Sequence, residues 1–117
     1  MYIEICIIGD NNSTTCDPQY IGCYVDDRNR DLKHGPGASG SWKWNVFWSV
    51  TTCNDQCQGY IYFSLQFFGR QCFCGNAYAS SYQYQKRNDS ECGGENGVGG
   101  TWSNSIYKTC GNENYFL

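Results

Sequence analysis

The chain has 117 residues, nine of them cysteine, and a formal net charge of −3 at pH 7. It carries 4 Trp, 10 Tyr and 6 Phe but few aliphatic side chains, so a single small domain must fold around aromatic rings and cross-links. The acidic balance argues against nucleic acid as a partner, and no apolar run in the sequence is long enough for a membrane span. No cofactor is expected, because the sequence has no phosphate-binding loop, dinucleotide fingerprint or metal-ligand pattern.

The opening segment alternates apolar side chains with others. Ile3, Ile5 and Ile7 fall on one face, which predicts a strand over residues 1–8. Glu4 and the lack of a basic start are not typical of a signal peptide. We therefore expect that an export signal has been removed or that the chain is a piece of a longer protein.

Strand and helix patterns follow along the rest of the chain. Val50, Cys53 and Cys57 share one face of a short helix, which Ser49 or one of the threonines after Val50 can cap. Gly69 turns the chain between two strands of a hairpin. The prediction is an α+β fold in which one short helix packs on a small antiparallel sheet with long loops. The expected elements are a strand at 20–25, a loop at 26–45, a helix at 49–58, strands at 60–67 and 71–75, a loop at 76–101 and a strand at 102–109.

The cysteine spacing favours disulfides over zinc. The short spacings run from Cys53 to Cys57 and from Cys72 to Cys74, whereas zinc sites usually pair two Cys-x2-Cys spacings, often with histidine. The single histidine, His34, lies in a glycine-rich loop. We therefore expect disulfides, an oxidising compartment and no metal.

The two short cysteine pairs match in length. Cys53 and Cys57 would lie ~6 Å apart along a helix axis, and Cys72 and Cys74 ~6.6 Å apart on one face of a strand. If the hairpin turns as predicted, its second strand runs parallel to the helix and gives Cys53–Cys72 and Cys57–Cys74, although the opposite pairing stays open. Each bridge would stabilise the fold by roughly 3 kcal/mol in the chain-entropy model.

Three N-glycosylation sequons agree with secretion. Asn11 and Asn12 begin two overlapping sequons, and Asn88 begins the third, in a polar and turn-like segment. We expect one glycan at the overlapping pair and one at Asn88.

Six short motifs between residues 20 and 108 carry a family resemblance. The most specific is GRQCFCGN at 69–76, and the others are YIGCY at 20–24, RDL at 30–32, VTTC at 50–53 followed by Cys57, GY at 59–60 and GGTWSNSIY at 99–107. In this order they resemble the WSC domain, a small extracellular cysteine-rich module. The resemblance implies a secreted or cell-surface, non-catalytic module that binds polysaccharide. It also implies a WSC-like domain over 20–108, between an N-terminal arm at 1–19 and a C-terminal arm at 109–117.

The cysteines depart from the family pattern. The family usually has eight, and the matching stretch has six, so the resemblance implies that one family disulfide is missing. Val98 stands where one of the missing cysteines would be expected. The resemblance leaves three outer cysteines, Cys6, Cys16 and Cys110. We expect them to tie the two arms to the core, for example through a Cys16–Cys110 disulfide, which leaves Cys6 unpaired or intersubunit. The cysteines expected within the domain's disulfides are Cys23, Cys53, Cys57, Cys72, Cys74 and Cys92.

A sugar-binding site needs an exposed aromatic ring beside hydrogen-bonding groups, because ring faces stack on pyranose C–H groups. The expected polar partners are Arg30, Arg70 and Asn76. The aromatic candidates are Trp42, Trp44, Trp48, Tyr78, Tyr82, Tyr84 and Trp102. The competing interpretation places aromatic rings in the core, above all Phe47, Tyr62, Phe67, Phe73 and Trp102.

Catalysis is not expected, because His34 is the only histidine and oxidised cysteines are not nucleophiles. Two functions compete. The first is a secreted module that binds polysaccharide or another glycan. The second is a structural subunit of an extracellular filament or coat, a homo-polymer that assembles through its terminal arms and an intersubunit disulfide of Cys6. The expected assembly residues are Ile3, Ile5, Ile7, Tyr115 and Phe116.

Overall fold

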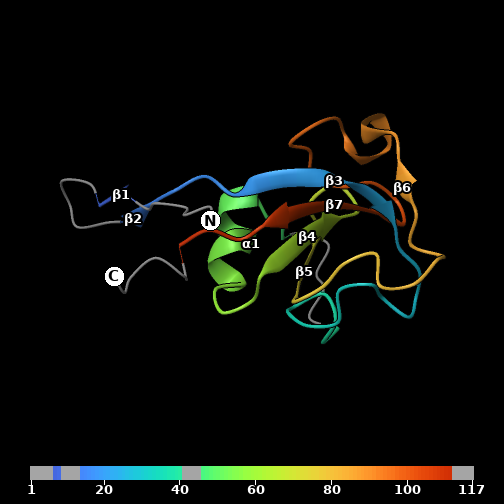
Figure 1. Ribbon diagram of the computed structural model, residues 1–117, viewed down its shortest axis with the longest axis horizontal. Helices are drawn as coiled ribbons and strands as arrows, with labels where there is room; N and C mark the ends of the chain where they lie inside the picture. Colours follow the sequence, from blue (N-terminus) through green and yellow to red (C-terminus); the bar gives the residue numbers. More distant parts are fainter. Residues whose placement is uncertain (1–6, 9–13, 41–45, 112–117) are drawn as a thin grey trace.

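The computed structural model describes residues 7–8, 14–40 and 46–111. It confirms an α+β fold with one short α-helix and a small antiparallel sheet (Figure 1). No helix among the described residues is long and apolar enough to cross a membrane. The elements are β1 (Ile7–Ile8), β2 (Thr14–Thr15), β3 (Gln19–Val25), α1 (Val50–Gln56), β4 (Tyr62–Gln66), β5 (Gln71–Gly75), β6 (Lys86–Arg87), the 3-10 helix η1 (Asp89–Cys92) and β7 (Ser103–Lys108).

The main sheet has five strands in the order β5-β4-β7-β3-β6. The last long strand, β7, lies between β3 and β4, so Ile106 faces Gly22 on one neighbour and Ser64 on the other. β1 and β2 form a separate two-stranded sheet, on the far side of α1 from β6 in Figure 1. The segment predicted as a loop at 76–101 also contains β6 and η1, and β2 lies before the predicted strand at 20–25.

The helix begins where a capping box closes its first turn. The Ser49 side-chain oxygen accepts from the Thr52 backbone N–H at 3.0 Å, and the Thr52 hydroxyl oxygen accepts from the Ser49 backbone N–H at 2.8 Å. This reciprocal pair satisfies two donors that a helix end leaves unpaired. Ser49 is thus the cap among the three residues predicted for that role, and the helix ends at Gln56 with Cys57 as its C-cap.

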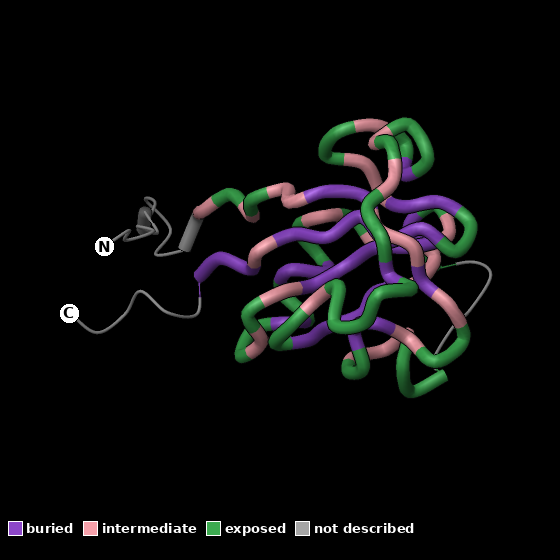
Figure 2. Tube along the Cα trace, turned by 45° about the vertical axis from the view of Figure 1, so that its right-hand side comes forward, coloured by how far each residue is buried: buried purple, intermediate pink, exposed green. Residues whose placement is uncertain are grey.

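Apolar side chains cover both faces of the sheet. One cluster lies between α1 and the sheet and contains Phe63 and Tyr107, whose stacked rings are 5.0 Å apart. A second cluster, Leu32, Phe73 and Ile106, lies on the opposite face. In Figure 2 the buried residues follow the strands while the exposed ones lie mainly in loops. Because both faces are covered, the polar side chains of β4 are buried as well.

Among the described residues, four disulfides join the fold: Cys16–Cys110, Cys23–Cys92, Cys53–Cys72 and Cys57–Cys74. The helix and the hairpin are therefore linked in the parallel arrangement that the matched spacings favour. Cys16–Cys110 connects the two arms, which are separated by 94 positions in the sequence.

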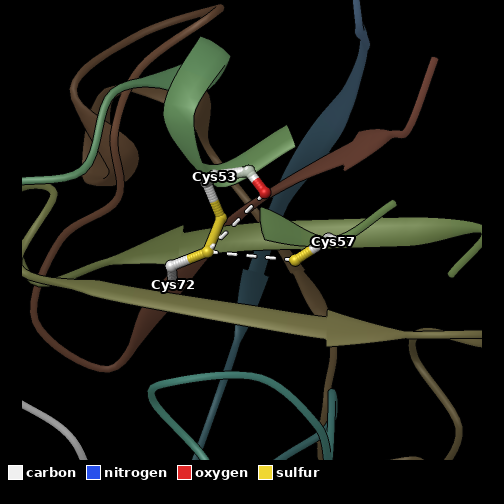
Figure 3. A group of neighbouring side chains, drawn as sticks. All are labelled: Cys53, Cys57 and Cys72. Atoms are coloured by element: carbon white, nitrogen blue, oxygen red, sulfur yellow. Dashed lines mark hydrogen bonds between the residues drawn. A yellow bond between two sulfur atoms is a disulfide. The ribbon is translucent and has the colours of Figure 1, made fainter. Parts of the chain in front are cut away.

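Three cysteine sulfurs gather between α1 and the hairpin. The Sγ atoms of Cys53, Cys57 and Cys72 all lie within 4.8 Å of one another (Figure 3). Each of the three is bonded to another sulfur, in Cys53–Cys72 or in Cys57–Cys74. Since a thiolate is what binds a metal ion, this cluster in its oxidised form is a structural linkage.

Several predicted residues lie outside the described part of the chain. They are Cys6, which is predicted to be unpaired or intersubunit, the sequon residues Asn11 and Asn12, the aromatic candidates Trp42 and Trp44, and the assembly residues Ile3, Ile5, Tyr115 and Phe116. Their roles stay predictions. Ile7, the remaining assembly residue, lies in β1, where it pairs with Thr15 of the same chain.

Candidate functional site

A cavity of about 260 Å³ opens at one end of the main sheet. Four segments build it: the loop after β3, the end of β4, the start of β5 and the turn before β7. Its lining is mixed, with two aromatic rings among polar side chains. The lining residues are Arg30, Gln66, Phe67, Gln71, Thr101 and Trp102.

Arg30 lies between two aromatic rings. Its guanidinium carbon is 4.9 Å from the centre of the Phe73 ring and 5.0 Å from the centre of the Trp102 ring. Its Nη1 also donates to Asp26 Oδ2 at 3.1 Å. An arginine has five N–H donors, and the side chain is 22% exposed, so Arg30 keeps donors for a ligand while the rings and the carboxylate hold it in place.

A buried polar network supports Arg30 from below. Asp26 is only 3% exposed, and its carboxylate accepts from Arg30, from the Asp31 backbone N–H at 2.9 Å and from Gln66 Nε2 at 2.8 Å. Gln66 Nε2 also donates to Asn104 Oδ1 at 3.1 Å. A buried carboxylate is tolerated only when it is paired and hydrogen-bonded. The network therefore fixes the floor of the cavity.

The backbone around the cavity is strained. Arg30, Phe67 and Trp102 have φ values of 62°, 54° and 52°. These lie in the left-handed backbone region, which residues other than glycine rarely adopt. Each such residue costs of order 1–3 kcal/mol, and strain of this kind clusters at functional sites. Hydrogen bonds hold it in place, for example from the Phe67 N–H to the Gly100 carbonyl at 2.9 Å. These three residues present their side chains to the cavity.

Exposed aromatic rings continue from the cavity across the turn between β4 and β5. Phe68 is 59% exposed and its ring is 5.8 Å from that of Phe67. Phe47 is 62% exposed, and the guanidinium of Arg70 lies 4.6 Å from its ring centre. Trp102 is 44% exposed. We call Phe47, Phe67, Phe68 and Trp102, with Arg30 and Arg70, the aromatic ridge.

Two residues of the ridge were wrongly predicted to lie in the core. Phe47 and Trp102 were expected to be core residues, and both are exposed. Phe73 is buried as expected, whereas Tyr62 and Phe67 are half-buried. Neither of the exposed pair lies inside a strand: Phe47 lies in the segment just before α1, and Trp102 lies in the turn before β7, so no cross-strand neighbour covers either ring.

The prediction that Tyr84 offers a sugar platform is wrong. Its side chain is buried, and its hydroxyl donates to Asp27 Oδ1 at 2.9 Å. Burial, together with this hydrogen bond, raises the pKa of Tyr84 to about 12. The same hydrogen bond lowers the pKa of Asp27 from its ordinary value. Tyr84 therefore anchors its loop to the segment before Arg30.

The other predicted side chains lie apart from the cavity. Tyr82 is 87% exposed but does not line it. Tyr78 packs edge-to-face on Tyr62, with ring centres 4.9 Å apart. Asn76 accepts from the Ile61 backbone N–H at 3.0 Å, and half-buried Trp48 packs against the first core cluster.

Arg30, Arg70 and Trp102 were predicted from the sequence as site candidates. Six further residues of the cavity and the ridge were not: Phe47 and Phe67 were assigned to the core, and Gln66, Phe68, Gln71 and Thr101 were not proposed. The available signal was the Phe67-Phe68-Gly69 turn, where two adjacent aromatic side chains at a hairpin turn cannot both be buried in the sheet.

The fold and this surface define a small disulfide-linked module with an exposed aromatic and polar face. The sequence model of the WSC domain matches residues 20–112, and the chain belongs to the WSC domain family. Members of this family are typically extracellular or cell-surface modules, in general non-catalytic, and the family suggests carbohydrate binding.

One curated relative is a WSC domain-containing protein of Arthroderma benhamiae. It is 29% identical over 105 residues, which cover 86% of this chain and 14% of that protein. The chain thus spans about a seventh of that relative's length. No solved structure matches the chain significantly.

Proposed function

We propose that this WSC domain is a secreted, non-catalytic module that binds polysaccharide along the aromatic ridge, with one sugar ring in the cavity against Trp102. The observation that carries the proposal is the exposed indole of Trp102 beside the guanidinium of Arg30. An indole face stacks on the C–H side of a pyranose, and the guanidinium donates to the hydroxyl groups at the ring edge. Gln71 and Thr101 add further hydrogen-bonding groups.

The charge of the cavity favours a neutral, hydroxyl-rich ligand. The charge of Arg30 is balanced by Asp26, the carboxylate that contacts it directly. A ligand therefore meets N–H donors without a strong net field. The cavity volume, about 260 Å³, lies just below the ~300–1,000 Å³ typical of complete small-molecule sites. This size suits one unit of a longer chain whose neighbours lie on the rest of the ridge.

A binding assay tests the proposal directly. The full chain is incubated with insoluble chitin, β-1,3-glucan, cellulose and mannan, and the bound fraction gives the dissociation constant for each. We expect Trp102→Ala to weaken binding about tenfold, equal to about 1.4 kcal/mol. Tyr82→Ala is the matched control, because Tyr82 is an exposed ring outside the cavity, and it should bind like the wild type. Equal losses in both variants, or no binding to any of the four, would overturn the proposal.

One observation favours the alternative, a structural subunit of a filament or coat. β1 and β2 form their own two-stranded sheet, and short strands with open edges can pair with a neighbouring chain. We propose assembly through the arms at 1–19 and 109–117 as the second candidate function. Electron microscopy and a non-reducing gel of the full chain test it. Ordered polymers, or a ladder that Cys6→Ser abolishes, would support assembly, and a monomer under both conditions would reject it.

A further inference from the structure

Asn88 has an exposed side chain that does not cap the helix it precedes. It lies between β6 and η1 and is the N-cap of η1, with φ −65° and ψ 141°. Asparagine at an N-cap normally accepts a hydrogen bond from the first helical turn. Here the Asn88 side chain makes no capping hydrogen bond and is exposed to solvent. Its amide group is therefore accessible and uncommitted.

The two residues after Asn88 complete a sequon. Ser90 is exposed, and the residue between them is Asp89 rather than proline. The family assignment and the disulfides of the described residues favour an oxidising, extracytoplasmic environment. That is the compartment in which sequons are modified.

We propose that Asn88 carries an N-linked glycan. The side-chain Nδ2 attacks C1 of the first sugar of a lipid-diphosphate-linked oligosaccharide, the donor used by the transferase of the secretory pathway. The C1–N bond forms as the bond between C1 and the phosphate oxygen breaks. The lipid diphosphate leaves with the electron pair, and Nδ2 loses one proton. No oxidant or reductant takes part.

The surface next to Asn88 suits a covalently attached sugar. A polar hollow of about 560 Å³ lies beside it, lined by Lys86, Arg87, Asn88, Asp89 and Glu91. Arg87 Nη1 donates to Glu91 Oε1 at 2.8 Å across this hollow. These charged groups can hydrogen-bond the hydroxyl groups of the first sugar units.

The glycan would cover one edge of the main sheet. β6 is an edge strand, paired with β3 on one side only. The register places Lys86 opposite Tyr24 and Arg87 opposite Cys23, so the chain reaches Asn88 while moving away from Val25 and the cavity end. An attached oligosaccharide would block edge-to-edge pairing at β6 and leave the aromatic ridge open. This role holds whether or not the ridge binds polysaccharide.

Glycopeptide mapping tests the proposal. The full chain is secreted from a eukaryotic host through an added leader, and a co-expressed glycoprotein reports that the transferase is active. Treatment with a peptide N-glycosidase in heavy-oxygen water should convert Asn88 to labelled Asp. Ser90→Ala should remove this label, whereas Ser90→Thr should retain it. Asn96→Gln changes an exposed asparagine outside any sequon and should leave the pattern unchanged.

The result that overturns the proposal is equally definite. If the co-expressed glycoprotein is modified and the Asn88 peptide is recovered unlabelled, Asn88 is not a glycosylation site. Because the readout is a mass at one residue, it does not depend on sugar binding or on assembly.

Discussion

Arg30 and Trp102 contact each other across the cavity, with the guanidinium 5.0 Å from the ring centre, although 72 positions separate them in the sequence. Both hold a left-handed backbone, with φ 62° and φ 52°. These two strained residues present a cation and an aromatic face to the same cavity. The position of their side chains is therefore maintained although the backbone strain lowers the stability of the fold.

Two substitutions of Trp102, to glycine and to alanine, should weaken binding alike but differ in the free energy of unfolding. Glycine adopts a positive φ without steric penalty and alanine does not, so we expect Trp102→Gly to be more stable than Trp102→Ala by about 1 kcal/mol. Both variants should bind polysaccharide about tenfold more weakly than the wild type. Urea denaturation measures the difference. At Thr101, which has no positive φ, the order should reverse, with alanine more stable than glycine. If the alanine variant is the more stable one at both positions, backbone strain at Trp102 is not significant.

Removing the buried carboxylate of Asp26 should destabilise the protein strongly. Asp26→Ala leaves Arg30 without its ion pair and leaves Gln66 without one acceptor, beneath the cavity. Breaking a buried pair costs about 3 kcal/mol. Asp55→Ala, at an exposed position of α1, should change stability by less than about 0.5 kcal/mol. Thermal or urea unfolding of both variants measures this, and similar small losses would mean that the network contributes little.

Stability should fall at high pH because Tyr84 must remain protonated. Its pKa is raised from 10.0 to about 12, so its contribution is complete below pH 10 and is lost as the pH rises through about 12. The pKa of Asp27 is lowered, so its own contribution is present above pH 3.8 and is lost as the pH falls below that value.

The pH dependence is measured by the urea midpoint between pH 7 and 12, compared among variants. Tyr84→Phe should reduce stability at pH 7 and flatten the decline above pH 10, because the hydroxyl that titrates is gone. Tyr82→Phe, at a side chain 87% exposed, should leave the curve unchanged. An unaltered decline in Tyr84→Phe would assign it to other groups.

A methyl group at Gly99 should be far more harmful than one at Gly94. Both glycines have positive φ, +85° and +96°, so each substitution to alanine carries a similar backbone penalty of about 1 kcal/mol. A Cβ at Gly99 would also collide with the backbone carbonyl of Leu65, whereas a Cβ at Gly94 meets nothing within 4 Å. We expect Gly94→Ala to fold with a modest loss and Gly99→Ala to be secreted poorly or unfolded. Equal stability of the two would mean that the Gly99 backbone moves freely away from β4.

The disulfide linkage of helix and hairpin could be predicted from local geometry. The rise per residue in a helix and in a strand is nearly constant, so the separations of Cys53 from Cys57 and of Cys72 from Cys74 follow from spacing alone. The helix cap at Ser49 and the hairpin turn at Gly69 were local in the same sense. The family motifs were contiguous in the chain as well, which is why they were visible without a structure.

Which aromatic rings are buried could not be predicted in this way. Tyr84 and Trp102 both lie in polar, glycine- or serine-rich stretches, yet one is buried against Asp27 and the other is exposed above Arg30. The difference depends on which distant segment covers each ring. It is set by long-range hydrogen bonds that single-residue propensities do not contain.

Composition, cysteine spacing and motifs are properties of short stretches of chain, so the amino-acid sequence was enough to predict an aromatic, disulfide-linked α+β module of the WSC family. The position of the cavity depends instead on long-range packing. The cavity forms because Asp26 and Gln66, 40 positions apart, meet in a buried hydrogen bond beneath Arg30. Contacts at such separation arise from the packing of the whole sheet, and that packing selects the rings left exposed to solvent.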